Sequence, residues 1–356
     1  SSRSSPTSPT STPTRRWALW LLSRNARTVL TRHAVCAIEA HTKQHATGNL
    51  VVAFRPLLRL RGNLHRAGVR CGSVVVVGKQ VATAEGANSQ LSIANVKLWQ
   101  PGNAYLYTLK VEAIVDGNVV DEYQLSVGVR TVKVDGNKFL INNEPFYFTG
   151  FGMHEDHVVK GKGHDNSFLV NDFQLLKWIG ANSFRTSHYP YAEEVMDYAD
   201  RHGIVIIDET AAVGLNQTFT SMFGGPKLPT FGPETANEKT QASLLQAVRE
   251  LIARDKNHPS VVLWSITNES ETGIPEAVDF FKPAIDLARE LDSRPVTYIN
   301  VMTEPFGKCL IAPLVDVICL NRYWGWYEDH ADLANAQLHL EAELKGWTEK
   351  YNVPFI

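Results

Sequence analysis

The sequence predicts an α/β protein, because short apolar strands alternate with amphipathic helices along most of the chain and polar side chains gather where the strands end. Strands rich in β-branched residues and without polar alternation are typical of a parallel sheet buried on both faces. The intervening helices would cover those faces, as in other folds built from repeated strand–helix units. We expect six strands, at residues 146–152, 182–189, 203–209, 261–268, 295–300 and 315–323.

Three segments have the apolar spacing of helices that cover a sheet: residues 171–181, 241–259 and 333–351. In the first, four apolar residues are expected along one face: Phe173, Leu176, Trp178 and Ile179. In the second, apolar residues recur at i, i+1, i+4, i+7 and i+8 from Leu244. That segment ends with basic residues, which suit the negative end of a helix dipole, and a proline stops it.

The strand count and the polar strand ends favour a (β/α)₈ barrel over a doubly wound sheet. No Gly-x-Gly-x-x-Gly motif follows the first strand and the sequence contains no P-loop, so neither nucleotide-binding fold is supported. Six strands are complete, and residues 353–356 have the pattern of the start of a seventh. Because a barrel needs its full set of strands to remove its edges, residues 137–356 are predicted to form an incomplete (β/α)₈ TIM barrel of six to seven units.

Residues 74–136 have a different pattern, with short strand-like runs separated by turn residues. Regular spacing of this kind indicates an immunoglobulin-like β-sandwich, of which about sixty residues would be only a part. The segment just upstream, residues 53–73, does not alternate convincingly. We therefore predict a partial sandwich ahead of the barrel.

The first 73 residues differ from the rest in charge and complexity. They hold twelve Lys and Arg residues against one acid, Glu39, and open with a Ser/Pro/Thr-rich tract too polar to bury itself. An Arg-rich, acid-poor segment resembles an organellar targeting sequence, while the missing initiator Met favours a partial or wrongly assembled gene. This basic head is expected to be disordered or artefactual. The compartment stays open, with a cytoplasmic location slightly favoured.

The composition argues against several kinds of partner. The formal net charge is −2, so no general attraction to nucleic acid or to an anionic membrane is expected. The apolar run at 17–22 is far shorter than the roughly 20 residues that a membrane-spanning helix needs. The four cysteines show no CxxC spacing, and we expect Cys309 and Cys319 in the core rather than in a metal site or a disulfide.

Polar side chains at the predicted strand ends suit the hydrolysis of a glycosidic bond. That reaction needs two carboxyl groups across the scissile bond and aromatic faces for the sugar ring. The strand ends supply both types, in His154, Glu155, Asp156, Arg185, Ser187, His188, Asp208, Glu209, Asn268, Glu269, Asn321, Arg322, Tyr323 and residues 324–327. The HExxH zinc pattern is absent, so no metal is expected at the His-Glu-Asp-His run that starts at 154.

Glu269 is the strongest candidate for the proton donor. It follows the apolar strand 261–268 and would be partly removed from water there, which raises a carboxyl pKa toward that of a useful general acid. Asn268 beside it would hydrogen-bond the sugar 2-hydroxyl. Periodicity alone leaves another interpretation open, because Asn-Glu at a strand end is also a common helix N-cap with a first-turn acid.

Two long stretches resemble the signatures of a known family. NSFRTSHYP at 182–190, followed by DRHGIVII, resembles the first signature of glycoside hydrolase family 2, and DKNHPSVVLWSITNE at 255–269 resembles its acid/base signature. The resemblance covers residues 74–356. Within the family, FYFTGFGMHED, IIDETAAVG and VICLNRYWGWY are most similar to members that act on β-D-glucuronides. It implies hydrolysis with retention, through a covalent glycosyl-enzyme intermediate and without a cofactor or metal.

By matching motif, the resemblance implies that Glu269 is the general acid/base. It implies a glycone pocket lined by Asp156, His188, Asn268, Tyr323 and Tyr327, with Trp326 nearby. The implied parent is a longer homo-oligomer with a jelly-roll domain, a sandwich and a barrel, and its partner is a small-molecule glycoside. The family's nucleophile is a Glu at the tip of the seventh strand, which would lie beyond residue 356, so we expect this chain alone to be inactive or nearly so.

Two alternatives remain open on the sequence. Position 270 is Ser where members acting on glucuronides usually have Pro, which keeps a β-galactoside or β-mannoside substrate in consideration. The other alternative is a non-catalytic sugar-binding remnant that retains the pocket aromatics.

Overall fold

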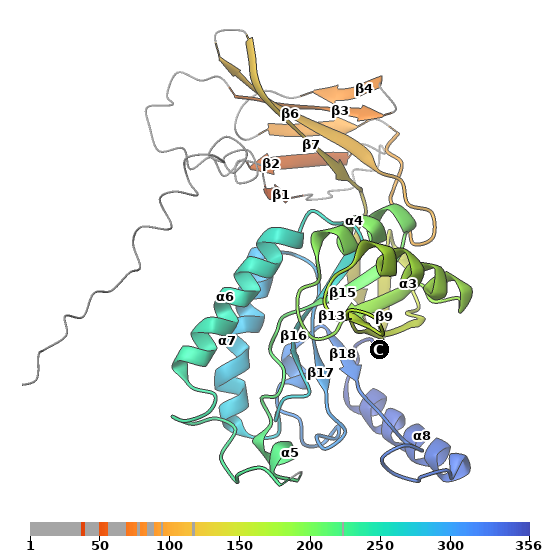
Figure 1. The fold of residues 1–356 in the computed structure, drawn as a ribbon, viewed down its shortest axis with the longest axis vertical. Helices are drawn as coiled ribbons and strands as arrows, with labels where there is room; N and C mark the ends of the chain where they lie inside the picture. Colours follow the sequence, from red (N-terminus) through yellow and green to blue (C-terminus); the bar gives the residue numbers. More distant parts are fainter. Residues whose placement is uncertain are drawn as a thin grey trace, which may run out of the picture.

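The computed structural model describes residues 37–39, 50–55, 69–76, 79–83, 89–93, 95–115, 118–222 and 224–356. Antiparallel strands lie at one end of the molecule, and a curved parallel sheet with helices outside it forms the larger part (Figure 1). Within the described part of the chain, no helix has both the length and the apolar composition needed to cross a membrane.

Six parallel strands form the larger sheet, and their order in space is their order along the chain. They are β11 (Gly150–Met153), β14 (Ser183–Thr186), β15 (Val205–Glu209), β16 (Val261–Asn268), β17 (Val296–Asn300) and β18 (Val317–Leu320). Every residue of β14 to β17 is buried, because side chains cover the sheet on both faces. Phe355 forms a further parallel bridge with Ile318. The predicted six strands and the start of a seventh are therefore confirmed.

The concave face of this sheet packs on a small antiparallel sheet of β8 (Val132–Asp135), β9 (Lys138–Ile141) and β10 (Glu144–Pro145). Phe139 and Ile141 of β9 join a core with inward side chains of the barrel strands, among them Val205, Ile207 and Ile299. This contact gives the inner face of the incomplete barrel an apolar floor, so that polar side chains can occupy the strand ends without opening the core to water.

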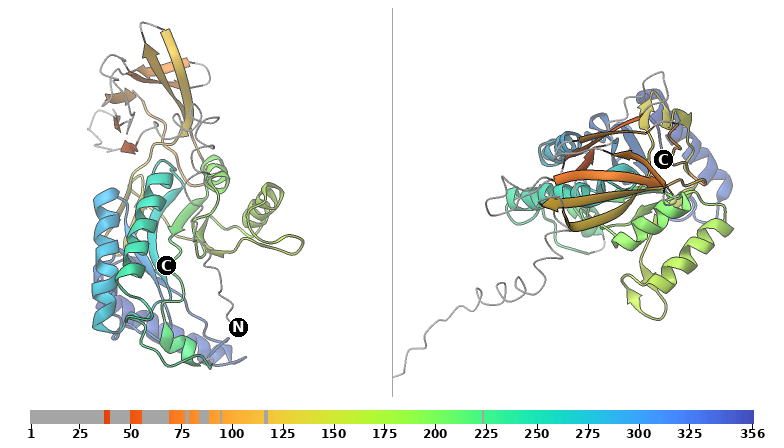
Figure 2. Two further views of the ribbon diagram at one scale, coloured as in Figure 1. Left: turned by 60° about the vertical axis from the view of Figure 1, so that its left-hand side comes forward. Right: turned by 90° about the horizontal axis from the view of Figure 1, so that it is seen from above.

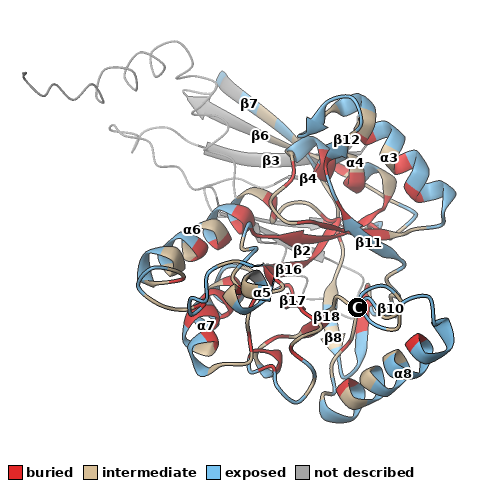
Figure 3. Cartoon of the chain, turned by 60° about the horizontal axis from the view of Figure 1, so that its bottom comes forward, coloured by how far each residue is buried: buried red, intermediate tan, exposed pale blue. Residues whose placement is uncertain are grey.

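Helices cover the convex face: α3 (Asn166–Trp178), α4 (Glu193–His202), α6 (Glu238–Asp255), α7 (Pro275–Leu291) and α8 (Leu333–Lys350), with the short α5 (Gln217–Met222) and a 3₁₀ turn, η1 (Ala312–Leu314), between them. α6 and α7 lie side by side along the sheet (Figure 2). Buried residues concentrate in the strands and the inner helix faces, whereas the outer faces of α3 and α8 are exposed (Figure 3).

The helix predictions are confirmed for α6 and partly wrong for α3. In α6 the stripe begun by Leu244 is buried, and the helix starts at Glu238 because the Asn237 side chain caps it. In α3 the buried stripe includes Phe173 and Leu176, but Trp178 is 82% exposed and Ile179, the C-cap just after the helix, is 56% exposed. Five residues after Phe173, Trp178 is turned by about 500°, which takes it off the buried face.

The antiparallel strands form two sheets, as a sandwich requires. One contains β1 (Ala37–Glu39), β2 (Leu50–Arg55) and β5 (Ser89–Ile93), and the other contains β4 (Lys79–Thr83), β3 (Val69–Val76), β6 (Tyr107–Val115) and β7 (Asn118–Val127) in that order. Strands β1, β2 and the start of β3 precede residue 74, where the sequence showed no convincing alternation. The predicted domain boundaries stay predictions, and most of the basic head lies outside the described residues.

Side-chain donors connect the sandwich side of the chain to backbone carbonyls of the barrel. Trp99 donates its indole N–H to the Asp200 carbonyl at 2.8 Å, and Arg130 donates to the carbonyls of Pro259 and Val261 at 2.9 and 2.6 Å. Burial and the nearby Arg294 charge lower the pKa of Arg130 to about 9. These contacts hold the start of β16 against the segment around Arg130, and the other end of β16 leads to the acid/base candidate, Glu269.

Replacement of a buried apolar residue of α6 tests the covered face. Leu251 is 3% exposed, and Leu251→Ala is expected to lower the free energy of unfolding by about 2–5 kcal/mol, because it leaves a cavity under the helix. The matched control is Leu338→Ala on α8, where the side chain is 62% exposed and a loss below about 0.5 kcal/mol is expected. Urea denaturation measures both, and equal losses would contradict the assignment of faces.

Asp208 makes the stability depend on pH. It is fully buried beside the Asp255 carboxyl, and burial, followed by repulsion from Asp255, holds the pKa of Asp208 well above its ordinary value. The folded state therefore keeps a proton that the unfolded chain releases, so stability is full at acid pH and falls as pH rises through the interval between the two pKa values.

Asp208→Asn should remove this dependence. As pH rises from about 4 to 8, the melting temperature of the wild type is expected to fall relative to that of the variant, because only the wild type loses the contribution of the Asp208 proton. Asp286→Asn, at an exposed position of α7, is the control and should show a constant difference. A constant difference for Asp208→Asn would show that Asp208 is ionised in the folded protein.

Candidate active site

Glu269 is the first residue after β16, and the fold holds both its backbone and its carboxylate. The backbone N–H donates to the Ile299 carbonyl on β17 at 2.9 Å. With a φ of 51°, Glu269 has the left-handed conformation that non-glycine residues adopt mainly where the surroundings impose it. The half-buried side chain accepts a hydrogen bond from Asn321 Nδ2 to Oε1 at 2.7 Å. The Tyr323 side chain lies near enough for the charge of this carboxylate to act on its hydroxyl.

A buried ion pair lies beside Glu269 at the ends of β14, β15 and β16. Arg185 Nη1 donates to both carboxylate oxygens of Glu209, at 2.8 and 2.9 Å, and to Asn268 Oδ1 at 3.2 Å. Ser265 donates its hydroxyl to Glu209 Oε2 at 2.8 Å. The Glu209 side chain is fully buried, so the Arg185 charge and these donors compensate for the water it has lost.

His188 extends this network toward the mouth of the barrel. Its Nδ1 lies 2.9 Å from Glu209 Oε1 and 3.1 Å from Arg185 Nη1. Its ring meets the ring of His154 edge to face, with centroids 5.3 Å apart. Burial, followed by the proximity of His188, lowers the pKa of His154, so the His154 ring is neutral at neutral pH. The charge of Asp156 reaches the same ring and opposes that shift.

Asp156 lies on the hairpin of β12 (Asp156–His157) and β13 (Gly161–Lys162), and its side chain is exposed. The hairpin follows β11, the first strand of the sheet. Asp156 lies close enough for its charge to act on His154, whose ring packs against His188.

The segment after β18 presents three aromatic side chains. Tyr323 and Tyr327 pack edge to face, with ring centroids 5.2 Å apart. Burial, followed by the charge of Glu269, raises the pKa of Tyr323, so its hydroxyl keeps its proton. Trp326 donates its backbone N–H to the Tyr323 carbonyl at 3.0 Å, and its indole is 71% exposed. Such exposed aromatic faces suit the apolar faces of a sugar ring.

A hollow of about 200 Å³ lies between β11 and the last residue of the chain, Ile356. Arg185 and Asn321 border it, and its apolar lining includes Ile299 and Cys319, whereas Glu269 is not among the residues that line it. Cys309 and Cys319 are buried free cysteines, as predicted.

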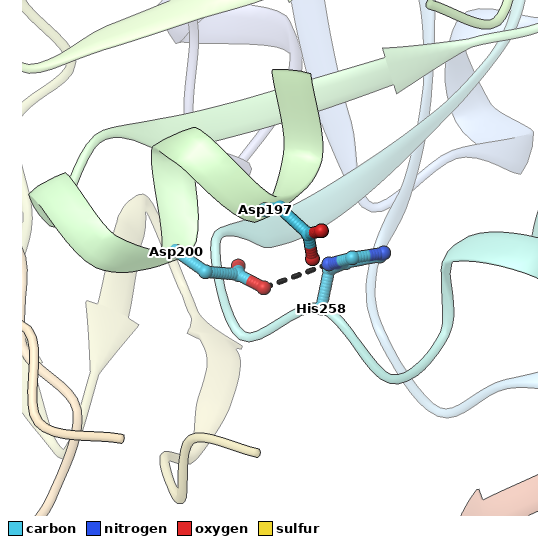
Figure 4. Close-up of side chains that lie close together, drawn as sticks. All are labelled: Asp197, Asp200 and His258. Carbon is cyan, nitrogen blue, oxygen red and sulfur yellow. Dashed lines mark hydrogen bonds and ion pairs between the residues drawn. The ribbon is translucent and has the colours of Figure 1, made fainter. Parts of the chain in front are cut away.

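One cluster with metal-ligand chemistry lies away from this site, among the residues that the structure describes. Asp197 and Asp200, one turn apart on α4, face His258 in the segment before β16 (Figure 4). His258 Nδ1 lies 2.7 Å from Asp200 Oδ2, and the Ser260 N–H donates to Asp200 Oδ1. Burial alone would lower the pKa of His258, but the hydrogen bond and charge of Asp200 raise it. A carboxylate oxygen only accepts, so Nδ1 of His258 donates to Asp200, and this contact links α4 to the segment before β16.

The structure brings most of the predicted residues together, at unequal depth. Asn268 is buried, Glu269 and His188 are half-buried, and Asp156, Tyr323, Tyr327 and Trp326 are exposed at the rim. Ser265 was missed, although a hydroxyl inside the run VVLWSITN is a signal for a polar partner on that strand. Asn321 was seen only as a polar strand end, because nothing in its spacing indicates that it contacts Glu269.

Comparison with known proteins identifies the family. A family model described as the TIM barrel domain of glycosyl hydrolases family 2 matches residues 132–356, and a second model of the same family matches residues 34–130. The chain belongs to glycosyl hydrolases family 2. The predicted fold class, an incomplete TIM barrel preceded by a sandwich domain, is confirmed by these matches and by the six-stranded sheet.

Several glycosyl hydrolases of this family resemble the chain closely. The β-glucuronidase of Paenibacillus borealis is 50% identical over 281 residues, which are 78% of this chain and 46% of that protein, and the human β-glucuronidase is 45% identical over 287 residues, 78% and 42%. The solved β-D-glucuronidase of Dictyoglomus thermophilum matches with a TM-score of 0.79 and 40% identity, over 88% of this chain and 52% of that one. The chain therefore spans about half the length of these relatives.

Neutralising Glu209 should strongly destabilise the fold. Glu209→Gln leaves the buried Arg185 guanidinium without a counter-charge, and we expect a loss of about 3–5 kcal/mol in the free energy of unfolding. Glu349→Gln is the control, because the exposed Glu349 pairs with Lys345 at 3.7 Å and its loss should stay below about 1 kcal/mol. Chemical denaturation distinguishes the two, and similar losses would mean that water screens the Arg185–Glu209 pair.

Proposed function

We propose that this chain carries the acid/base half of a retaining glycosidase site that acts on β-D-glucuronides. The observation that carries the proposal is the Glu269 carboxylate, half-buried at the tip of β16 and held by Asn321 at 2.7 Å. Support for the substrate comes from the relatives, which are β-glucuronidases, and from a Ruminococcus gnavus β-glucuronidase, 35% identical with a TM-score of 0.76, solved with D-glucaro-d-lactam.

Glu269 would first donate its proton to the leaving-group oxygen and then accept one from the attacking water. Its environment suits both steps, because Asn321 holds one oxygen of the carboxylate while the side chain is only half-buried. A donor fixed in this way meets the glycosidic oxygen without further ordering of its own side chain.

Asn268 would bind the sugar 2-hydroxyl. Arg185 donates to Asn268 Oδ1, so the oxygen of that amide is already engaged and its Nδ2 remains as the donor for a substrate oxygen. His188 is fixed through Nδ1 by the Arg185–Glu209 pair, which leaves Nε2 for the substrate. Asp156, Tyr323, Tyr327 and Trp326 would complete the glycone pocket at the rim.

Three expectations from the sequence stay predictions: that the nucleophile lies beyond residue 356, that this chain alone is inactive or nearly so, and that the longer parent is a homo-oligomer. Retention requires the second carboxyl about 5–5.5 Å from Glu269. We expect that group from a seventh strand, whose start pairs with β18 through Phe355 and Ile318.

A fused protein tests the substrate and the role of Glu269. Residues 1–356 are joined to the remaining C-terminal part of the Paenibacillus borealis relative, and hydrolysis of aryl β-D-glucuronide, β-D-galactoside and β-D-mannoside is measured. We expect glucuronide to be preferred at least a hundredfold in kcat/KM, and Glu269→Gln to lower kcat for a poor leaving group by about 10²–10⁴. The chain alone is assayed beside it and should show no turnover.

The matched control is Gln246→Ala on the exposed face of α6, which removes another amide–carboxylate contact, to Glu250 at 2.7 Å, and should leave all rates unchanged. Preference for galactoside or mannoside would support the alternative substrates. Binding of D-glucaro-1,5-lactone without turnover in the fused protein would favour a sugar-binding remnant.

A further inference from the structure

The side-chain amide of Asn321 sits directly on the proposed acid/base. Asn321 follows β18 and Glu269 follows β16, so the contact joins two strand ends that are 52 residues apart in the sequence. A carboxylate oxygen only accepts, so the amide must present its Nδ2 rather than its oxygen to Glu269 Oε1. The amide nitrogen in turn only donates, so Oε1 is held as an acceptor.

We propose that Asn321 is a positioning residue that decides which oxygen of Glu269 carries the catalytic proton. A neutral carboxyl group has one hydroxyl and one carbonyl oxygen, and the carbonyl oxygen is the one that accepts from a donor. While Asn321 donates to Oε1, the proton is directed to Oε2. This inference rests on the proposed function, since it concerns the proton that Glu269 would give to the leaving group.

Asn321 can impose this direction because its own backbone is fixed. Its N–H donates to the Asn300 carbonyl at 3.0 Å, and its carbonyl accepts from Arg322 Nη1 at 2.8 Å. Arg322 also donates to Asn300 Oδ1 at 2.8 Å and to Glu343 Oε1 of α8 at 2.7 Å. Glu343 additionally accepts the indole N–H of Trp324 at 3.1 Å. The amide therefore stands on a segment anchored to both β17 and α8.

The other polar neighbour of Glu269 does not favour one of its two oxygens. The Tyr323 hydroxyl is close enough for the Glu269 charge to act on it, but a hydroxyl both donates and accepts and can rotate to suit either protonation state. Of these two neighbours, the Asn321 amide is the one whose hydrogen bond distinguishes the two oxygens.

Side-chain amide NMR on the full chain tests this without any need for turnover. With Asn-selective ¹⁵N labelling, the Asn321 amide signals are assigned by their loss in Asn321→Leu and followed as pH is lowered until Glu269 is protonated. We expect the Asn321 Nδ2 proton that binds Glu269 Oε1 to keep a downfield chemical shift at both the high-pH and the low-pH end. Its shift should change once in between, as Glu269 takes up a proton, and this change should be absent in Glu269→Gln. Movement of that proton to the position of a water-exposed amide at acid pH would overturn the proposal, since it would show that Oε1 takes the proton.

Gln337→Ala supplies the matched control. Gln337 donates to the exposed Glu341 of α8 at 2.7 Å, the same length as the contact under test, and its loss should leave the Asn321 signals unchanged. If the Asn321 proton stays hydrogen-bonded at both pH values but the fused protein hydrolyses no glucuronide, the positioning role is supported and only the proposed function is contradicted.

Leaving-group dependence in the fused protein provides a second readout that a general structural defect would not produce. Asn321→Leu is expected to lower kcat/KM about a hundredfold for a methyl glucuronide, whose leaving group needs the proton. For 2,4-dinitrophenyl glucuronide, whose leaving group needs none, kcat/KM should stay within about threefold of the parent, because kcat/KM covers only the steps up to the glycosyl-enzyme intermediate. Equal losses for the two substrates would show that Asn321 supports the fold rather than the proton transfer.

Discussion

The Arg185–Glu209 ion pair is the interaction on which the rest of the site depends. Glu209 is fully buried and Arg185 nearly so, and water is therefore not available to solvate either charge. An isolated charge at such a depth is far more costly than a pair, so the two side chains hold the ends of β14 and β15 in one relative position. Because Arg185 of β14 also donates to Asn268 of β16, its guanidinium connects the ends of three strands, β14, β15 and β16.

The apolar floor below this pair makes it possible. Phe139 and Ile141 of β9 fill the inner face of the sheet, so the strands bring their charged and amide side chains to one end only. Parallel strands end at the same edge, which collects side chains from segments far apart in the sequence. Asn268, Glu269 and Asn321 meet there for this reason. The left-handed backbone of Glu269 is the local strain that turns its side chain toward Asn321.

Other buried charges in this chain follow the same rule of local compensation. Asp292 forms an ion pair with Arg294, which offsets the effect of burial and lowers the pKa of Asp292 to about 2. His258 is paired with Asp200 on α4. Asp208 differs, because its neighbour Asp255 is a second carboxyl and the compensation is a proton. The site network resembles the first two, since a cation rather than a proton neutralises Glu209.

The sequence by itself determined the strand–helix alternation, the six barrel strands and the identity of the strand-end residues, because burial on both faces leaves a continuous apolar run that can be read locally. It also pointed to Glu269, through the apolar strand that ends there and the resemblance of its surroundings to a known signature. It misplaced Trp178 and Ile179, since an apolar residue near a helix end has no required face, and it missed β1 and β2, where apolar and polar residues do not alternate convincingly.

Tertiary structure alone decided which strand-end groups touch. Local sequence carries no information about the contact between Asn321 and Glu269, or about Ser265 facing Glu209, because each pair joins residues more than fifty positions apart. Those distances follow from strand register and sheet curvature, which depend on the packing of the whole sheet against its floor and its helices. Residue types set what chemistry was possible here, and the folded sheet set which carboxylate lies beside which donor.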